Sequence, residues 1–188
     1  MREDRPPPGD RFLGLLKPIE GELEVYCRRL IWNPEEVPDA LQNAALRAYK
    51  AFDRYHDDAS FRAWMFKILT HEIFALNRKY GRVAQFEFHL DAEELDLLPA
   101  LEQAAAYTDW LLSPDALKDA LDQDLVAALK TLTDSERAVL LLRAIGDFHY
   151  REISEALDIP LGSVMGHLAR ARKKMREAIR HAQKRAPL

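Results

Sequence analysis

The stretch IPLGSVMGHLARARKKMRE, residues 159–177, decides the fold of the C-terminal part of this chain. Pro160 and Gly162 disfavour a continuous helix, so the chain is expected to turn at these residues. Beyond the turn, apolar residues recur at spacings of four, three and four, which places them on one face of a helix. They are Val164, Leu168, Ala171 and Met175. Ser163 is predicted to cap this helix at its start.

Two further helices are predicted on the N-terminal side of this turn. Thr133 and Glu136 form a capping box, in which each side chain satisfies a free backbone N–H at a helix start. The helix that they open, DSERAVLLLRAI, ends at Gly146, and the next run, HYREISEAL, carries its apolar residues on one side. Two short helices joined by a tight turn, the second rich in basic residues, are typical of a helix-turn-helix.

Positive charge is concentrated on the last of these helices. The whole chain has a net charge of −4, yet five of the seven residues from 170 to 176 are Lys or Arg. A helix fits the major groove of duplex DNA, where exposed side chains meet base edges while flanking Lys and Arg meet phosphates. The candidate residues for duplex DNA are Arg151, Ser163, Met165, His167, Arg170, Lys173 and Lys174. A basic helix end that is only solvated, and favoured by the helix dipole, remains the alternative.

The N-terminal part of the chain is also predicted to be helical. In PDALQNAALRAYKAFDRY a helix begins near Asp39, and its apolar residues recur at spacings of four, three and four. They are Leu41, Ala45, Ala48 and Phe52. A second helix in SFRAWMFKILTHEIFALNRKYG stops at Gly81, and an earlier helical run passes through LEVYCRRLIW. Together these runs predict a first helical domain over residues 10–81.

The middle of the chain differs in charge and in pattern. Residues 81–121 hold nine acidic side chains against Arg82 and Lys118, a balance of −7, and show no sustained period. We expect an acidic linker over residues 82–121, with one short helix near AEELDLLPALEQ, and a second helical domain over residues 122–180. The predicted fold class is therefore all-α, with two small helical domains and no strands.

Several other classes of protein are disfavoured by the sequence. No window approaches the roughly 18 apolar residues of a membrane span, and MREDRPPPGD lacks the apolar region of a secretion signal, so we expect a cytoplasmic protein without membrane insertion. The single Cys27 makes no internal disulfide. His71 and Glu72 begin an HExxH pattern, but its fifth position is Ala75. We therefore expect no metal site, no cofactor and no enzymatic activity.

Two blocks of the chain carry a family resemblance. The block LVAALKTLTDSERAVLLLRAIGDFHYREISEALDIPLGSVMGHLARARKKMRE resembles region four of bacterial RNA polymerase sigma factors, and DALQNAALRAYKAFDRYHDDASFRAWMFKILTHEIFALNRK resembles region two. These two regions joined by a linker are the layout of the extracytoplasmic-function (ECF) class. The resemblance implies binding to core RNA polymerase, recognition of the −10 and −35 promoter elements, and control by an anti-sigma factor. It also implies a linker that occupies a basic channel of the polymerase.

The resemblance assigns roles to particular residues. Region two of the family binds the polymerase clamp through one helix and captures an unpaired base of the −10 element with the helices that follow. The implied polymerase-binding residues here are Asp39, Gln42, Asn43, Leu46 and Arg47. The implied −10 residues are Arg62, Trp64, Lys67, His71, Arg78 and Lys79. Basic and aromatic surfaces accept unstacked bases, although Trp64 has a structural alternative as a core aromatic residue.

The sequence also departs from the family pattern. Asn43 stands where an acid is usual, and His71 and Ala75 replace an Asn and an Asp. The recognition helix reads GSVMGHL in place of GTVKSRL, so Met165 offers a base only apolar contact. These departures keep an alternative open, in which the chain is a decoy that binds an anti-sigma factor without binding promoter DNA. A repressor or activator with this helix-turn-helix would leave the N-terminal half without a role.

Overall fold

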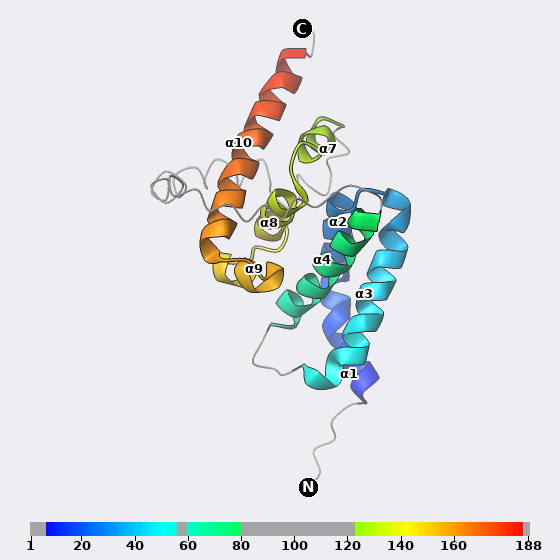
Figure 1. Ribbon diagram of the computed structural model, residues 1–188. Helices are drawn as coiled ribbons and strands as arrows, with labels where there is room; N and C mark the ends of the chain where they lie inside the picture. Colours follow the sequence, from blue (N-terminus) through cyan, green and yellow to red (C-terminus); the bar gives the residue numbers. More distant parts are fainter. Residues whose placement is uncertain (1–6, 56–59, 80–122, 186–188) are drawn as a thin grey trace.

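The computed structural model describes residues 7–55, 60–79 and 123–185, and within them every regular element is a helix. Figure 1 shows two groups of helices, α1 to α4 and α7 to α10, which we call the N-terminal unit and the C-terminal unit. The predicted all-α class is confirmed. The predicted linker over residues 82–121, including the short helix expected near residues 92–103, lies outside the described residues.

The N-terminal unit consists of four α-helices joined by short connections. They are α1 (Pro8–Leu16), α2 (Glu20–Leu30), α3 (Val37–Ala51) and α4 (Phe61–Lys79). Single turns of 3-10 helix cover Lys17–Ile19, Pro34–Glu36 and Phe52–Arg54. Pro38 lies in the first turn of α3, where the missing N–H costs no helical hydrogen bond. Helix α3 begins at Val37, two residues before the start near Asp39 that the sequence predicted.

An aromatic cluster closes one end of the N-terminal unit. Phe12 of α1 contacts the rings of Phe52 and Phe61 edge-on, with centroid distances of 5.3 and 5.8 Å. On α3 the buried face consists of small residues, including Ala40 and Ala44, which let its neighbours approach closely. The apolar stripe predicted for this helix is therefore displaced by one residue at its start. Leu41 and Ala45, the first two residues of the predicted stripe, are only half-buried. Helix α3 packs against α4 and α2 through the adjacent stripe, whose side chains are smaller.

The C-terminal unit consists of α7 (Gln123–Leu129), α8 (Asp134–Ala144), α9 (Tyr150–Leu157) and α10 (Leu161–Arg185). The predicted capping box of α8 is confirmed. Thr133 Oγ1 accepts a 3.2 Å hydrogen bond from the Glu136 N–H, and Glu136 Oε2 accepts one of 2.9 Å from the Thr133 N–H. The capping box therefore fixes the start of α8.

The turn of the helix-turn-helix lies slightly earlier than the sequence predicted. Helix α9 ends at Leu157 and is followed by its C-cap residue Asp158, which adopts the left-handed conformation with φ 54°. Helix α10 already begins at Leu161, because the Pro160 carbonyl accepts a hydrogen bond of 3.1 Å from the N–H of Val164. The prediction that Ser163 caps this helix is therefore wrong. Ser163 lies within the first turn of α10. Pro160 and Gly162 also lie at this helix start, where they destabilise a helix less than in its interior.

The two units pack directly against each other, with α2 against α8 and α4 against α9. In Figure 1, α10 runs along the outer side of the C-terminal unit, and its last turns project beyond the other helices. The predicted inward stripe of α10, from Val164 to Met175, is buried as expected. Within the described ranges no helix combines the length and the apolar character needed to cross a membrane.

Candidate polymerase and nucleic-acid interface

The five residues expected to bind polymerase lie together on the outer face of α3. They are Asp39, Gln42, Asn43, Leu46 and Arg47, and all five are exposed. Their spacings of three, one, three and one place them along one side of the helix. Arg47 Nη1 donates a 2.6 Å hydrogen bond to Oε2 of Glu72 on α4, which fixes the direction of its side chain. The structure therefore presents these residues as one continuous surface.

An apolar contact region lies within this surface and extends beyond the predicted residues. Leu46 and Tyr49 are each 48% exposed. They are three positions apart and so are neighbours on the helix. Sequence reasoning missed Tyr49, although its spacing from Leu46 was available as a signal. Exposed apolar groups rimmed by polar residues are typical of protein contact surfaces.

The residues expected to capture the −10 strand lie on α4, and most of them share one side of it. Trp64, Lys67, His71 and Arg78 follow at spacings of three, four and seven. The Trp64 ring is half-buried and packs on Tyr55 and Phe61, with centroid distances of 5.2 and 5.8 Å. Trp64 thus belongs to the rim of the aromatic cluster, in agreement with the core alternative. Arg78 and Lys79 are exposed at the C-terminal end of the helix.

Arg62 lies on a different side of α4 from these residues. Its side chain is held between the two units. Its guanidinium donates hydrogen bonds of 2.8 and 2.7 Å to Oε2 of Glu22 on α2, and it also donates to the carbonyl of Gly146 after α8. The same group lies 4.8 Å from the centre of the Phe148 ring and 5.5 Å from that of Phe66. Arg62 is therefore ordered by contacts from both units.

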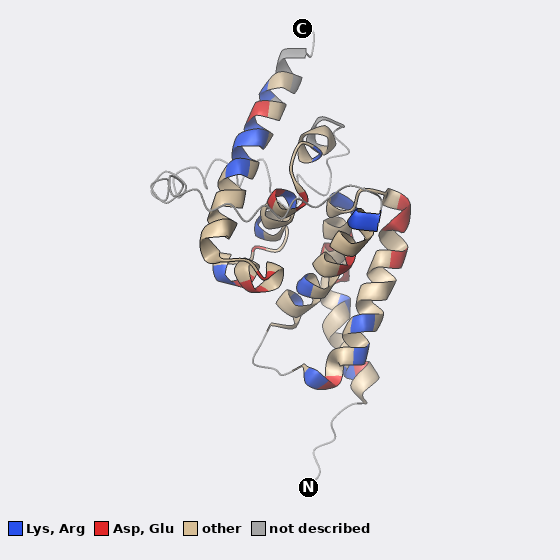
Figure 2. Ribbon diagram, viewed as in Figure 1, with Lys and Arg blue, Asp and Glu red and all other residues tan. Residues whose placement is uncertain are grey.

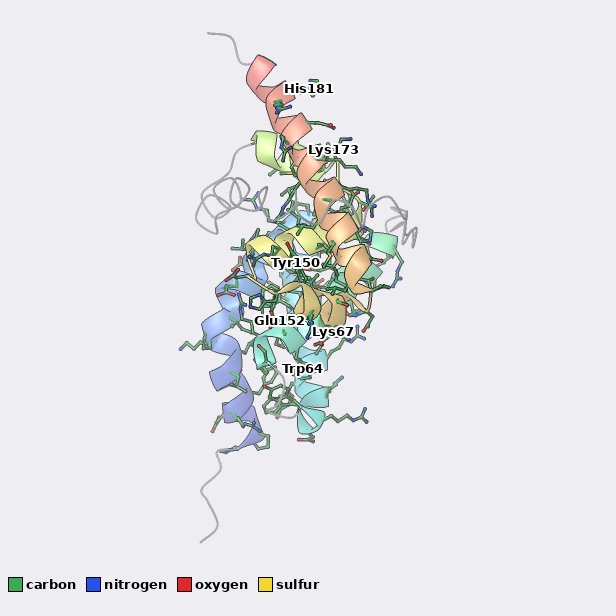
Figure 3. The ribbon with its side chains drawn as sticks, turned by 90° about the vertical axis from the view of Figure 1, so that its left-hand side faces the viewer. Trp64, Lys67, Tyr150, Glu152, Lys173 and His181 are labelled. Atoms are coloured by element: carbon green, nitrogen blue, oxygen red, sulfur yellow. The ribbon has the colours of Figure 1, made fainter. Side chains whose placement is uncertain are left out.

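Lys67 and His71 face the end of α9. Lys67 Nζ donates to Oδ1 of Asp158 at 2.8 Å and to the Glu155 carbonyl at 2.9 Å, and His71 Nε2 lies 3.6 Å from Oδ2 of Asp158. Burial lowers the pKa of His71, and the nearby Asp158 carboxylate only partly offsets this effect. Figure 3 shows Lys67 beside α9, whereas Lys173 and His181 lie far along α10.

The first residues of α10 and of α9 border an open hollow of about 580 Å³. Two of the predicted −35 residues, Arg151 and Met165, line it together with Tyr150 and Leu161. Sequence reasoning missed Arg143 and His149, which also contribute to its wall. Basic groups and apolar groups thus meet at the N-terminal end of the recognition helix. That combination can contact both a phosphate backbone and a thymine methyl group.

The remaining predicted −35 residues are divided between the surface and the interior. Figure 2 shows Lys and Arg gathered along the middle of α10. Lys173 is exposed, whereas His167 is only 9% exposed, and its Nδ1 lies 3.1 Å from Nη2 of Arg170. Lys174 Nζ donates hydrogen bonds of 2.8 and 3.0 Å to the buried carboxylate of Glu136. Arg170 Nε lies 3.6 Å from the same group.

Glu136 therefore has two roles in the helix-turn-helix. It completes the capping box of α8, and it holds Lys174 and Arg170 of α10 at fixed positions. Its side chain is 3% exposed, whereas those of Lys174 and Arg170 are 39% and 36% exposed, so the carboxylate is buried and its basic partners reach it from the surface. The sequence indicated the first role through the spacing of Thr133 and Glu136. It contained no signal for the second, because the partners are 34 and 38 positions away.

Comparison with known proteins gives two family matches and several relatives. The family model described as Sigma-70 region 2 matches residues 18–83, and the one described as Sigma-70, region 4 matches residues 122–175. The ECF RNA polymerase sigma factor SigW of Bacillus subtilis (strain 168) is 27% identical over 172 residues, which cover 91% of this chain and 90% of that protein. The ECF RNA polymerase sigma-E factor of Escherichia coli (strain K12) is 26% identical over 140 residues, covering 73% and 71%.

A solved structure has the same fold. It is the sigma factor RpoE of Bartonella quintana in complex with the anti-sigma factor NepR. The likeness has a TM-score of 0.67 at 20% sequence identity and covers 90% of this chain and 97% of that one.

Proposed function

The chain belongs to the sigma-70 family, whose regions two and four it carries, and from this premise we propose how its surfaces direct transcription initiation as an ECF sigma factor. We propose that the N-terminal unit is region two over residues 10–81 and the C-terminal unit is region four over residues 122–180. An acidic linker over residues 82–121 joins them. Core RNA polymerase and promoter DNA are its partners.

The exposed face of α3 is the observation that carries the polymerase-binding part of the proposal. Five residues with the spacing of one helix side are all exposed, and Leu46 supplies a large apolar group among them. Leu46 and the neighbouring Tyr49 form an exposed apolar patch, and patches of this kind commonly mark contacts with another protein. Arg47 is held by Glu72 beside Leu46, so the surface is ordered before a partner arrives.

Two different DNA-binding modes fit the two units. On α10 the exposed Lys173 and the half-buried Met165 and Arg170 are placed to contact the duplex of the −35 element. On α4 the basic groups of Lys67 and Arg78, which share one side of the helix, are suited to the backbone of an opened −10 strand. We propose that Ser163 contacts a phosphate from the first turn of α10. The first three N–H groups of a helix lack partners within it and can meet a phosphate, and Ser163 is the third residue of α10.

The proposal includes a partner and a place of action. The relative of known structure was solved with an anti-sigma factor, which supports control of this chain by such a protein. We propose that the chain acts in the cytoplasm and contributes no catalysis of its own. On this view the polymerase performs the nucleotide transfer, and the chain supplies only recognition of the promoter.

The test is run-off transcription with purified core polymerase on a fragmented genomic library. We expect discrete transcripts that share a −35 and a −10 element, and their complete loss without the chain. Leu46→Ala is expected to lower transcript yield by weakening polymerase binding. Leu13→Ala is the matched control, because Leu13 is 60% exposed but lies on α1, outside the proposed surface.

The same experiment separates a working initiation factor from a decoy. A decoy would bind an anti-sigma factor yet give no promoter-specific transcript with any fragment. The buried position of His167 in the recognition helix is the observation that keeps this alternative in view, since a buried side chain cannot reach a base in this conformation. Transcripts with a shared −35 element would exclude it.

A further inference from the structure

We propose that His167 is a positioning residue for recognition of the −35 element. Its neutral imidazole holds the guanidinium of Arg170 in the direction from which Arg170 meets a base, and the contact is lost when the imidazole takes up a proton. This inference rests on the proposed −35 function of α10, and it adds a residue that sets specificity without touching DNA. His167 is only 9% exposed, so a direct contact with a base is closed to it in this conformation.

His167, Arg170 and Lys174 lie on one side of α10. Their spacings of three and four residues make them neighbours along the helix surface. Arg170 and Lys174 both reach the carboxylate of Glu136 at the start of α8. That carboxylate is buried, and the capping box with Thr133 fixes its position. Arg170 is therefore held against an ordered part of the C-terminal unit.

Two contacts fix the Arg170 guanidinium at two of its nitrogen atoms. Its Nε lies 3.6 Å from Oε1 of Glu136, and its Nη2 lies 3.1 Å from Nδ1 of His167. A guanidinium carries its N–H donors in one plane, so contacts at two nitrogen atoms also set the orientation of that plane. Arg170 is half-buried, which leaves part of the ordered side chain at the surface. Such a group favours a base edge that lies in its own plane.

The chemistry of the 3.1 Å contact determines the state of the imidazole. Arg170 has no acceptor and stays charged, so Nδ1 of His167 must accept the hydrogen bond. A ring nitrogen accepts only when it carries no proton, which places the ring proton on Nε2 and makes the imidazole neutral. The family pattern GTVKSRL has an arginine at this position, and arginine offers no acceptor. Holding Arg170 by an imidazole is therefore a feature of this chain's own recognition helix.

A proton on Nδ1 of His167 would turn this attraction into a repulsion. Two positive groups would then lie about as close as 3.1 Å, each presenting an N–H to the other. Helix α8 contributes one carboxylate to this cluster, that of Glu136, and it already receives Lys174 at 2.8 Å and Arg170 at 3.6 Å. A single negative charge does not balance three positive ones. The protonated ring therefore releases Arg170.

The position of Arg170 affects specificity more than overall affinity. Ordering one long side chain at an interface costs enough to change affinity by roughly twofold to tenfold, and an arginine that is already ordered avoids this cost. The gain applies only to a sequence whose base edge matches the fixed direction. Phosphate contacts, such as the one proposed for Lys173, are the same for every sequence. Release of Arg170 should therefore weaken the preference for one base and leave binding to other DNA unchanged.

Three variants separate this contact from other effects. His167→Asn keeps an acceptor, because the amide oxygen of asparagine is bonded to Cγ as Nδ1 is, but asparagine does not titrate. His167→Leu removes the acceptor and keeps an apolar side chain. His181→Leu makes the same change at an exposed position far along the same helix and is the matched control (Figure 3). The chain has six histidines, and the asparagine variant keeps the other five.

The main measurement selects duplexes that the full-length chain binds at low salt, from a pool with a randomised core of about ten base pairs. Sequencing of the bound pool gives the preference for each base, and Arg170→Ala marks the positions that depend on Arg170. There we expect His167→Leu to lower the preference roughly twofold to tenfold, whereas His167→Asn and His181→Leu retain it. Between about pH 8 and pH 5.5 the parent protein should lose preference by a similar factor, and the asparagine variant should not.

Nitrogen NMR of the full chain tests the contact without DNA. The signals of the His167 ring are assigned by their absence in His167→Asn. At about pH 8 we expect the chemical shift of Nδ1 to be that of a nitrogen without a proton, and that of Nε2 to be that of an N–H. The opposite arrangement would overturn the inference, because Nδ1 could not accept from Arg170.

Each outcome of the selection decides the inference. An unchanged preference in His167→Leu would overturn it, and so would an equal loss in the leucine and asparagine variants, which would indicate a packing role. A pool without any base preference would refute both −35 recognition and the positioning role. A preference that depends on both Arg170 and His167, together with no transcript in the run-off assay, would uphold the positioning role and refute the initiation role.

Discussion

Trp32 and Asp134 are 102 positions apart in the sequence, yet the indole N–H of the first donates a 2.8 Å hydrogen bond to the carboxylate of the second. The bond joins the segment that follows α2 to the first residue of α8 and therefore joins the two units. Asp134 is 5% exposed and Arg137 2% exposed, so the junction lies out of contact with bulk water. Buried ionic groups are stable only while each keeps its partners.

Replacing Asp134 by alanine is expected to destabilise the fold strongly. The substitution removes the carboxylate partner of the buried Arg137, which costs about 3–5 kcal/mol when a buried pair is broken from one side. Chemical denaturation followed by circular dichroism measures the effect. Trp32→Phe keeps the ring over Arg137 and loses only the donor, so its cost should be about 1 kcal/mol. Equal costs for the two variants would contradict the role assigned to the charge.

Glu136 offers a way to separate helix capping from the hold on α10. Glutamine at this position can still complete the capping box but loses the charge that Lys174 contacts at 2.8 Å. Glu136→Ala loses both, and we expect it to be less stable than Glu136→Gln by about 1 kcal/mol. Thermal unfolding of the two variants checks the difference. If glutamine and alanine behaved alike, the cap would contribute nothing in the presence of the tertiary contacts.

Lys173 and Arg170 are predicted to contribute to −35 binding in different ways. Lys173 is exposed on the outer side of α10, so Lys173→Ala should weaken binding to all sequences and lower the salt slope by about one. Arg170 is held by Glu136 and His167, so Arg170→Ala should reduce discrimination between −35 sequences by about 1–3 kcal/mol. Fluorescence anisotropy at several salt concentrations measures both effects. Loss of discrimination in the lysine variant would reverse these assignments.

Gly146 is predicted to tolerate no side chain. A Cβ atom there would lie 2.6 Å from the Leu142 carbonyl oxygen and closer still to the Phe148 ring. Because a backbone carbonyl cannot rotate away, Gly146→Ala should cost about 1–3 kcal/mol. Gly21→Ala is a suitable control, since apart from its chain neighbours and the backbone of its own helix no atom lies within 4 Å of its Cβ position. Equal melting temperatures for the two variants would show that the turn adapts.

Cys27 is expected to be unreactive in the folded protein. Burial raises the pKa of its thiol to about 12, from an ordinary value of 9.0, so the neutral form is favoured in the native state. Because the folded state favours the protonated thiol, the stability linked to this pKa shift is complete below about pH 9 and declines as the pH rises toward 12. A thiol reagent at pH 8 should modify the folded chain only as fast as it unfolds, and at once in denaturant. Rapid modification of the native protein would contradict the buried position.

Much of the fold follows from local pattern. The Thr133–Glu136 capping box and the inward face of α10 depend on residues within a few turns of each other, and both predictions are confirmed. The start of α10 was placed three residues late, because a proline just before a helix can be read either as a break or as a start. The buried stripe of α3 differs from the predicted one at its start, because two adjacent sides of this helix carry apolar residues. Local spacing cannot choose between them.

The sequence by itself determined the helices, the helix-turn-helix and the separation of basic from acidic segments, because these depend on period, capping and composition within short stretches. The tertiary structure decided which basic side chains are accessible. Arg62, Lys67 and His71 share no local signal with Gly146 or Asp158, which lie more than 80 positions away. Only the folding of the chain brings these groups within hydrogen-bonding or ionic distance. Lys173 and Lys67 contribute the same charge to the composition of the chain. In the fold, however, Lys173 is exposed, whereas Lys67 is paired with Asp158.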